Sequence, residues 1–563
     1  MSSLFSRAAF RIFTASLSVG ILPKRRRFER GLARPREAQD ALLKRILKAN
    51  RSHYAERFKL DGRSSYEDFA RAVPIIDYDD LALWIERQVT DESSWIAPTR
   101  PLAYEKTSGS TGASKQIPYT RELLGSFQNL FLLWAQDVCS RGPELKGGRV
   151  FMSVSSSAQE QDEGKTRNGV PIGFEDDADY LSGQWRFWIE KFLVIPGEIK
   201  RLRSSEDFTY VLSALLLAAD DLEVVSIWNP SLLLVVLRTI QDRANEILAD
   251  CACGYVERQG LRFELKAVSA ERHESLLRTE PDWQRVWPEL KLISCWAGAH
   301  AKPLSDRLAT LFPQVWIQPK GLLATEAPLT IPWIEAGGFV PLPDEVFYEF
   351  EAEDGRILRL HELETGQRYE IIISQKGGLL RYRMGDFVRV AGSYLGSPLL
   401  DFEGRSNAVV DLVGEKLHEG FVASCLAELG GEASAFRCLI PTSSVGGGAR
   451  YHLLTESASN EAAEILEELL SRAYHYQVAR KQGQLAEISL LVREDAEAIV
   501  RQYQIDQGVK WGHIKHRPLF SLQDGEALYR QFNPVNQEIP AQISAENGVS
   551  EPSFVSRSII SSP

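Results

Sequence analysis

Short apolar runs that alternate with segments of helical period constrain this chain to an α/β fold. Residues 149–154, 222–228 and 290–296 have the length and composition of buried strands. Between and before them, residues 123–138, 208–217 and 231–248 repeat apolar side chains at helical spacing. A sheet whose strands are apolar on both faces needs helices to cover it, so the first part of the chain is predicted to contain an α/β sheet covered by helices, within a domain of mixed sheets.

The composition and the apolar pattern of the sequence change after about residue 332 and again after Gly404. The runs 347–350, 368–374, 379–382 and 387–390 are short and β-rich and are separated by Gly-containing turns, which predicts antiparallel strands in a small barrel or a distorted sheet. Strands and helices then alternate again, with a long helical run at 460–479. Because 563 residues exceed one typical core, several domains are expected. The predicted division is an N-terminal extension at 1–36, a large α/β domain at 37–404 that begins with a helix at 37–58, a smaller α+β domain at 405–531, and a flexible tail at 532–563.

Charge and cysteine content narrow the class of protein. A formal net charge of −11 argues against nucleic acid as a partner, since proteins that bind polyanions carry a net basic face. The six cysteines form no CxxC pair and no disulfide spacing, which favours a reduced, cytoplasmic location. No apolar run is long enough to span a bilayer. An apolar N-terminal stretch is followed by Lys24, Arg25, Arg26 and Arg27, so contact of this basic cluster with a membrane surface stays open beside the simpler interpretation as a surface helix.

The strongest local signal is the segment 107–115, which reads Thr-Ser-Gly-Ser-Thr-Gly-Ala-Ser-Lys. Glycines let backbone N–H groups approach a polyphosphate, hydroxyl groups add donors, and Lys115 supplies compensating charge. A Walker loop is disfavoured because Ser114 stands where that motif has glycine. An ordinary Ser/Gly surface turn is the structural alternative. The predicted phosphate-binding residues are Thr107, Ser108, Gly109, Ser110, Thr111, Gly112 and Lys115.

Three further motifs follow in order along the chain. Residues 321–327 read Gly-Leu-Leu-Ala-Thr-Glu-Ala, residues 382–386 read Tyr-Arg-Met-Gly-Asp, and residues 404–407 read Gly-Arg-Ser-Asn. Taken singly, Glu326 could be an ordinary loop carboxylate and Asp386 part of a β-turn. The three motifs and the Ser/Gly-rich segment occur together in one chain and in a fixed order, and it is improbable that all four occur by chance.

These four motifs resemble those of the adenylate-forming superfamily, which includes acyl-CoA ligases, luciferases and peptide-synthetase adenylation domains. Over about residues 37–531 the chain most resembles the auxin-responsive acyl-acid amido synthetases, the Gretchen Hagen family, in a bacterial-type branch. Residues 382–386 are close to that family's Tyr-Arg-Val-Gly-Asp, and residues 414–419, Gly-Glu-Lys-Leu-His-Glu, are close to its Gly-Asp-Lys-x-x-Glu. Residues 513–518, His-Ile-Lys-His-Arg-Pro, resemble its Gln-Tyr-Lys-x-Pro-Arg.

The resemblance implies an ATP- and acyl-binding adenylation domain at 37–404 and a mobile C-terminal domain. It also implies roles for single residues: Glu326, beside Thr325, binds the magnesium ion on ATP, Asp386 accepts the ribose hydroxyls, Arg405 belongs to the hinge, and Lys515 or Lys416 reaches the α-phosphate. There are departures from the family pattern. The tyrosine of its Tyr-Ala-Ser-Ser-Glu is replaced by Leu322, so adenine stacking is not carried over, and Asn407 replaces the hinge aspartate.

The expected reaction joins a carboxylic acid to an amino acid or another amine through an acyl-adenylate. An acyl-CoA ligase and a non-catalytic nucleotide-binding homologue are the alternatives, while a serine hydrolase is excluded because the chain has no Gly-x-Ser-x-Gly elbow. His300 and His418 are the candidate bases for the amine. Trp185, Trp188, Trp228, Trp296 and Trp333 could line a pocket for an aromatic acid, although tryptophans more often pack in cores.

Overall fold

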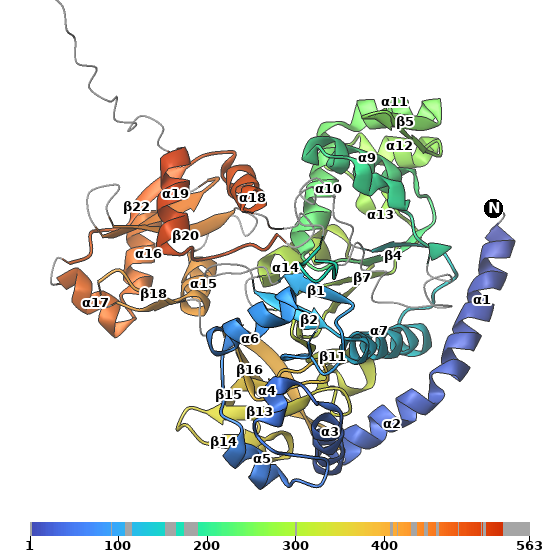
Figure 1. Cartoon of the computed structure of the whole chain (residues 1–563). Coiled ribbons are helices and arrows are strands. Elements are labelled where there is room, and N and C mark those ends of the chain that lie inside the picture. Colours follow the sequence, from blue (N-terminus) through green and yellow to red (C-terminus); the bar gives the residue numbers. More distant parts are fainter. Residues whose placement is uncertain are drawn as a thin grey trace, which may run out of the picture.

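The structure is a computed structural model of the whole chain (Figure 1). It describes residues 3–91, 93–106, 115–152, 165–173, 190–298, 301–405, 409–413, 415–429, 436–443, 449–457, 461–481, 484–507, 509 and 514–532. The tail predicted at 532–563 therefore lies outside the described residues from position 533 onward.

The chain begins with helices and a β-hairpin. In order these elements are α1 (Ser3–Gly20), α2 (Leu22–Ala33), α3 (Pro35–Ala49), α4 (His53–Glu56), α5 (Tyr66–Ala72), α6 (Tyr78–Thr90), β1 (Ala103–Lys106), β2 (Gln116–Tyr119) and α7 (Arg121–Arg141). Side chains fix several of the helix starts: Asp77 and Asp80 form a capping box at α6, and Thr120 accepts a hydrogen bond from the backbone of Leu123 at α7.

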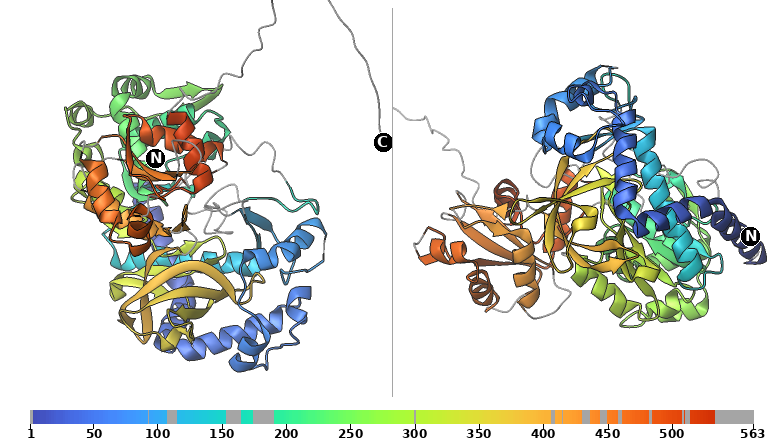
Figure 2. Two further views of the ribbon diagram at one scale, coloured as in Figure 1. Left: turned by 90° about the vertical axis from the view of Figure 1, so that its left-hand side faces the viewer. Right: turned by 90° about the horizontal axis from the view of Figure 1, so that it is seen from below.

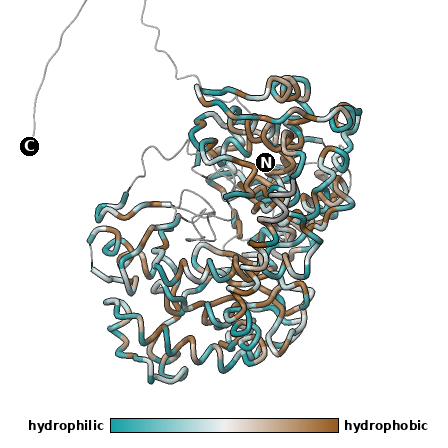
Figure 3. The backbone as a smooth tube through the Cα atoms, turned by 90° about the vertical axis from the view of Figure 1, so that its right-hand side faces the viewer, coloured by the Kyte–Doolittle hydropathy of each residue, from teal (hydrophilic) through white to brown (hydrophobic). Residues whose placement is uncertain are grey.

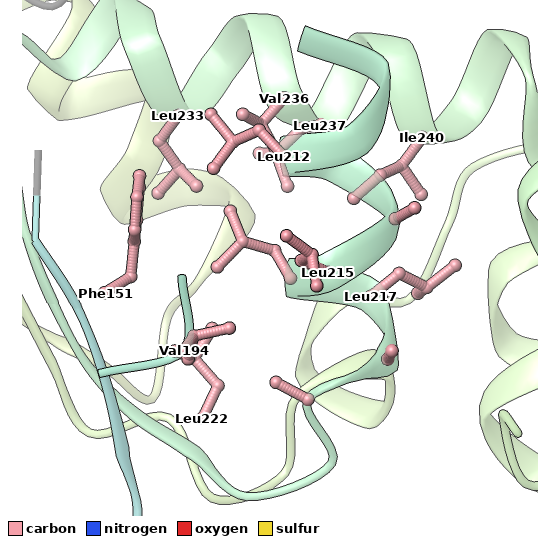
Figure 4. Close-up of a cluster of buried hydrophobic side chains, with 14 of the residues drawn as sticks. Phe151, Val194, Leu212, Leu215, Leu217, Leu222, Leu233, Val236, Leu237 and Ile240 are labelled. Carbon is pink, nitrogen blue, oxygen red and sulfur yellow. The ribbon is translucent and has the colours of Figure 1, made fainter. Parts of the chain in front are cut away.

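A four-stranded sheet forms the centre of the next part, which confirms the predicted sheet of buried strands, and all of its strand pairs are parallel. Its strands, in the order β3-β4-β7-β8, are β3 (Arg149–Met152), β4 (Leu222–Ser226), β7 (Leu292–Cys295) and β8 (Trp316–Pro319). The connecting elements are α9 (Ser205–Ala218), α10 (Pro230–Asp242), α11 (Ala244–Cys253), β5 (Tyr255–Arg258), β6 (Leu261–Glu264), α12 (Ala270–Leu276), α13 (Trp283–Val286) and α14 (Lys302–Leu311). Apolar side chains of α9 and α10 pack against one another and on the sheet, as Figure 4 shows around Leu215 and Val236. Burial of this cluster drives the helices onto the sheet.

The predicted antiparallel region is an open five-stranded sheet, order β14-β13-β15-β16-β17, rather than a closed barrel. Its strands are β13 (Phe347–Ala352), β14 (Ile357–Arg359), β15 (Arg368–Ser374), β16 (Tyr382–Tyr394) and β17 (Ser397–Arg405). Before it come β9 (Leu323–Ala324), β10 (Ala327–Pro328), β11 (Thr330–Trp333) and β12 (Gly338–Pro341). The two runs predicted at 379–382 and 387–390 are not two strands: residues 379–381 precede the strand, and β16 runs from Tyr382 through 387–390 by means of register shifts.

The C-terminal part has a three-stranded sheet of its own, order β20-β21-β22. Its elements are β18 (Val409–Val410), β19 (Leu417–His418), α15 (Glu419–Glu428), β20 (Arg437–Thr442), β21 (Arg450–Thr455), α16 (Ala462–Leu470), α17 (Tyr474–Lys481), β22 (Ser489–Val492), α18 (Ala496–Asp506) and α19 (Leu522–Phe532). Two apolar clusters lie within these residues, so this part has core packing separate from that of the preceding sheets. Figure 1 shows it to one side of the other layers, and Figure 3 shows the hydrophobic segments gathered toward the interior.

Three predicted helices are each divided in two. The run 37–58 breaks after Ala49, because Ser52 adopts an extended conformation and caps α4. The run 231–248 breaks at Arg243, whose backbone is not helical, and the run 460–479 separates into α16 and α17. The apolar period continues across these short breaks, which is why the sequence pattern does not reveal them.

The N-terminal helix α1 packs on α7 through Phe13 and Leu17, at the end of the molecule away from the C-terminal part (Figure 2). Most of the basic cluster contacts the protein itself. The ammonium of Lys24 donates to Asn129 at 2.7 Å, Arg25 donates to Gln136, and Arg27 forms an ion pair with Asp344. Among the described helices, none is both long enough and apolar enough to cross a membrane.

Candidate active site

The Ser/Gly-rich segment connects the two strands of a hairpin. β1 and β2 are antiparallel, with Lys106 opposite Gln116 where the hairpin opens toward the segment. Six of the predicted phosphate-binding residues, Thr107, Ser108, Gly109, Ser110, Thr111 and Gly112, lie outside the described residues. Lys115 is described, and its surroundings define this side of the site.

Lys115 lies between two tyrosines from distant parts of the chain. Its ammonium donates to the hydroxyl of Tyr382 at 3.5 Å and lies 5.4 Å from the ring centroid of Tyr78. The Tyr78 hydroxyl accepts a 2.8 Å hydrogen bond from the backbone N–H of Gln116. Burial raises the pKa of Tyr78, and the negative charge of Glu326 contributes. The raised pKa keeps the phenol of Tyr78 neutral beside the Lys115 ammonium.

Thr325 and Glu326 form the two-residue turn of a small hairpin. Ala324 of β9 pairs with Ala327 of β10, which leaves these two residues at the tip. Glu326 is 6% exposed. The hairpin lies close to the following strand, since a Cβ at Gly321 would be 2.2 Å from the carbonyl oxygen of Thr330.

A tyrosine connects this turn to the Ser/Gly-rich hairpin. The hydroxyl of Tyr119, the last residue of β2, donates a 2.7 Å hydrogen bond to the carbonyl oxygen of Thr325. The Tyr119 ring is stacked on Phe127 of α7, with 5.5 Å between centroids. The hairpin that ends in Tyr119 and the turn that carries Glu326 are thus held together by this hydrogen bond, and the stacking on α7 fixes the tyrosine that makes it.

Asp386 follows an irregularity in β16. The pairing of β15 with β16 shifts between Glu370 and Ile372, and Gly385 has a φ of +72°. In a regular strand, side chains point alternately to the two faces of the sheet. A bulge interrupts this alternation, so the face to which Asp386 points does not follow from its spacing to Tyr382. Asp386 is fully buried and stands opposite Arg405 in the register of β16 with β17. Direct contacts and strand register therefore link described parts of the motifs in pairs: Lys115 with Tyr382, the hairpin of Lys115 with Thr325, and Asp386 with Arg405.

Lys515 contacts a tryptophan that belongs to the parallel sheet region. Its ammonium is 4.2 Å from the ring centroid of Trp296, which follows β7. The backbone N–H of Trp296 donates to the carbonyl of Trp228, and the two rings are 6.1 Å apart. Lys320, six positions before Glu326, lies over the Trp228 ring and donates to Ser226 at 2.9 Å. Lys515 is thus at the carboxyl edge of the parallel sheet, from which the chain leads to the Thr325–Glu326 turn.

Lys416 is exposed and has a φ of +48°, in the left-handed region. Its neighbour Glu415 is buried and accepts hydrogen bonds from the backbones of Leu412 and Val413, each at 2.8 Å. The buried carboxylate of Glu415 therefore holds the backbone of the loop on which Lys416 lies.

Of the two candidate bases, His300 lies outside the described residues. The side chain of His418 reaches solvent, but neighbouring protein atoms remove part of its hydration, and this partial desolvation together with the charge of Arg368 lowers its pKa. Of the five candidate pocket tryptophans, Trp185 and Trp188 are also outside the described residues. Trp333 is buried against Phe28 and so belongs to a core, which leaves Trp228 and Trp296 near the site.

Sequence reasoning missed Tyr78, Tyr119 and Lys320, which connect the motifs to one another. None of them stands in a recognisable local pattern, because each acts through contacts more than 35 positions away. A groove of about 330 Å³ runs along α6 beside Tyr78 and Gln116, and it was not foreseen either. The groove is bounded by Ile85, Glu86 and Arg167.

Comparison with solved structures identifies the class of fold. The structure superposes on a GH3.15 acyl acid amido synthetase with a TM-score of 0.76 and 19% identity, over 92% of this chain and 96% of that one. A second structure, AtGH3.15 acyl acid amido synthetase in complex with 2,4-DB, gives the same TM-score at 17% identity and covers 94% of this chain and 97% of its own. The fold is that of these two-part α/β synthetases.

Sequence comparison gives the family. Residues 24–317 match the GH3 family N-terminal domain, and residues 339–405 match the GH3 family central domain. The chain belongs to the GH3 family.

Relatives with assigned names match most of the chain. The 4-substituted benzoates-glutamate ligase GH3.12 of Arabidopsis thaliana is 23% identical over 85% of this chain and 91% of its own. The indole-3-acetic acid-amido synthetase GH3.3 of the same plant is 23% identical over 88% and 92%. The jasmonoyl-L-amino acid synthetase JAR6 of Nicotiana attenuata is 24% identical over 66% and 70%.

Proposed function

We propose that this chain is an ATP-dependent acyl-acid amido synthetase. A substrate carboxylate oxygen attacks the α-phosphorus of ATP, and the bond to pyrophosphate breaks. An amine nitrogen of an amino acid then attacks the acyl-adenylate carbonyl, the bond to AMP breaks, and a base takes the amine proton. Membership of the GH3 family and the ligase names of its relatives support this reaction class.

The single observation that carries the proposal is the position of Lys115. Its ammonium lies beside Tyr78, whose pKa the charge of Glu326 helps to raise, and it donates to Tyr382, which stands in the same strand as Asp386. We assign Lys115 and the preceding segment to the phosphates, Asp386 to the ribose hydroxyls, and Lys515 or Lys416 to the α-phosphate. Thr325 and Arg405, the latter in the hinge motif, are assigned to further contacts with the nucleotide. Positioned charges of this kind stabilise the negative charge that gathers in a phosphoryl transition state.

The residues present fit a magnesium ion bound together with ATP. Glu326 offers a hard carboxylate oxygen that is partly shielded from water. Within the described residues no group of three or more His, Cys, Asp or Glu could hold a metal, so the remaining ligands would come from phosphate oxygens and water. When bound, the ion would neutralise phosphate charge.

The deciding experiment uses the purified full-length protein. Pyrophosphate exchange into ATP should depend on one or more acids of an aryl- and alkyl-acid library, and mass spectrometry should find an amide after an amino acid mixture is added. Exchange with thioester formation from coenzyme A, and no amide from any amino acid, would favour the acyl-CoA ligase. Exchange with no acid, in the presence of measurable ATP binding, would favour the non-catalytic homologue.

We also propose limits for the domains and a cellular location for the protein. We divide the chain into an extension at 1–36, an adenylation domain at 37–404, a mobile domain at 405–531 and a tail at 532–563. We place the protein in the cytoplasm, because its six cysteines are all free and the cytoplasm keeps thiols reduced.

Contact of the N-terminal basic cluster with a membrane also stays a prediction. The internal contacts of Lys24, Arg25 and Arg27 weigh against it. The exposure of Ile12 and Val19, at 56% and 75%, supports it. Cosedimentation of the full chain with phosphatidylserine vesicles would decide between the two, since a protein without this contact stays in the supernatant.

A further inference from the structure

The segment 514–519 is attached to both parts of the molecule. At its beginning, the carbonyl oxygen of Ile514 accepts a 2.9 Å hydrogen bond from the side-chain amide of Asn229, and Lys515 lies over Trp296. At its end, His516 bonds to the carbonyl of Arg437 and Leu519 pairs with a strand of the C-terminal sheet. Lys515 therefore sits where the segment crosses from one part to the other.

The two residues that receive this segment are rigidly held. Asn229 is 1% exposed and uses both ends of its amide: the oxygen accepts from the backbone of Ser231 and caps α10, while the nitrogen donates to Ile514. Trp296 is held through its backbone hydrogen bond to Trp228. Both residues follow central strands of the parallel sheet, β4 and β7, so the surface they form does not depend on a loose loop.

We propose that Asn229 and Trp296 form a dock that holds Lys515 in place for acyl-adenylate formation and releases it before amide transfer. The dock rests on the proposed function, and its members are positioning residues that act through Lys515. The contact suits reversible use because the neutral hydrogen bond from Asn229 and the cation–π interaction with Trp296 are each of modest strength. A domain that must rotate between half-reactions needs contacts it can break.

Two substitutions remove the dock while preserving the fold. Asn229→Asp keeps an oxygen that caps α10 but loses the donor to Ile514 and places a negative charge near its carbonyl. Trp296→Leu keeps an apolar side chain and removes the ring beneath Lys515. Ser204→Ala is the matched control, since it removes the cap of α9 without touching the segment. Thermal unfolding of each variant shows whether the protein remains folded.

The two half-reactions are measured separately. Pyrophosphate exchange should fall about fivefold or more in each dock variant, the factor expected for loss of one hydrogen bond. Amide formation from a chemically supplied acyl-adenylate should stay within about twofold of wild type, and Ser204→Ala should leave both rates unchanged. Equal losses in both half-reactions would overturn the proposal and make these residues part of a shared substrate pocket. No loss in either would overturn it as well.

A third measurement separates failure of the dock from failure of the proposed function. Amide hydrogen exchange in a peptide covering residues 514–520 should be faster in both dock variants than in wild type, whereas peptides from β20 and β21 should be unchanged. If the wild type shows no exchange of pyrophosphate with any acid, but the 514–520 peptide responds, the dock exists and the assigned reaction is wrong. If the peptide does not respond, the dock is refuted whatever the enzyme catalyses.

Discussion

The hydroxyl of Tyr119 donates a 2.7 Å hydrogen bond to the backbone carbonyl of Thr325, 206 positions further along the chain. Tyr119 stands four residues after Lys115, at the end of the strand that leaves the Ser/Gly-rich segment. Thr325 immediately precedes Glu326. This contact therefore fixes the proposed phosphate side of the site relative to its proposed metal side.

Tyr119→Phe should test this connection. The ring would remain stacked on Phe127, so the change removes the hydrogen bond alone. We expect the free energy of unfolding to fall by about 1 kcal/mol, together with slower pyrophosphate exchange. Urea unfolding and exchange kinetics measure the two effects, and Tyr255→Phe on the β5–β6 hairpin is the control. Unaltered exchange in a destabilised Tyr119→Phe protein would show that the bond serves stability only.

Asp386→Ala should weaken ATP binding by about 1.5 to 3 kcal/mol, the range for hydrogen bonds to a charged group. Isothermal calorimetry with ATP and magnesium gives the Kd directly. Asp386→Asn keeps the shape of this buried side chain and distinguishes lost charge from a repacking effect. Asp401→Asn, on the exposed side of the same sheet, is the control. An ATP affinity equal to wild type in both Asp386 variants would remove this residue from the ribose.

Lys515→Ala should reduce pyrophosphate exchange by about 10² to 10³, as expected when a charge that stabilises a transition state is lost. The fold should be unchanged, since Lys515 is not in an apolar core and its partner ring is on the other part of the molecule. Lys302→Ala, in a surface ion pair with Asp306, is the control. Normal exchange in Lys515→Ala, with loss in Lys416→Ala, would transfer the role to the second lysine.

The buried His452 should make the C-terminal part sensitive to acid. Burial, with the charge of Arg450 adding to it, lowers the pKa of His452 from 6.5 to about 4. Since the unfolded chain then binds the proton more readily, this stability is present above pH 6.5 and is lost as the pH falls toward 4. Between pH 7 and pH 5 the loss should be about 2 kcal/mol.

Urea unfolding of the wild type and of His452→Gln at pH 7 and pH 5 measures this effect. Between the two pH values, the free energy of unfolding of the variant should fall by about 2 kcal/mol less than that of the wild type, because glutamine at position 452 does not bind a proton. Parallel pH curves for the two proteins would show that His452 is not the cause.

A buried ion pair should matter more to stability than any surface pair. Arg381 donates two hydrogen bonds to Glu349 and others to the carbonyls of Ala70 and Val73. Glu349→Ala leaves the guanidinium buried without its partner, so the free energy of unfolding should fall by about 3 to 5 kcal/mol. Removing the exposed partner in Asp306→Asn should change it by no more than about 0.5 kcal/mol. Similar values for the two variants in urea unfolding would contradict this ranking.

The alternation of strands and helices and the antiparallel region after residue 332 could be predicted from the sequence. Both depend on local side-chain periods, and the structure has the corresponding elements, such as β4 and α7. The breaks at Ser52 and Arg243 could not be predicted, because an apolar period passes through a short interruption unchanged. The continuous strand β16 was also missed, because a bulge at a Gly-Asp sequence has the same composition as a turn.

The motifs of the candidate site were visible for a similar reason: Lys115, Glu326 and Asp386 each stand in a short pattern of small and polar residues. The residues that hold these motifs together were not visible. Tyr78 starts an ordinary capped helix, and Asn229 resembles any N-cap residue. Their contacts to Gln116 and Ile514 exist only once the chain has folded.

Close packing at Gly321 fixes the start of the hairpin that carries Glu326. Its main chain lies against Thr330, and the backbone N–H of Leu322 donates to the hydroxyl of that threonine at 2.7 Å. The backbone that leads to the Thr325–Glu326 turn is therefore held by main-chain contacts and by a threonine hydroxyl, and the packing of Leu322 and Leu323 against buried clusters adds to them. A side chain at position 321 would push this backbone away from Thr330, so the place of the Glu326 carboxylate depends on the lack of a side chain five positions earlier.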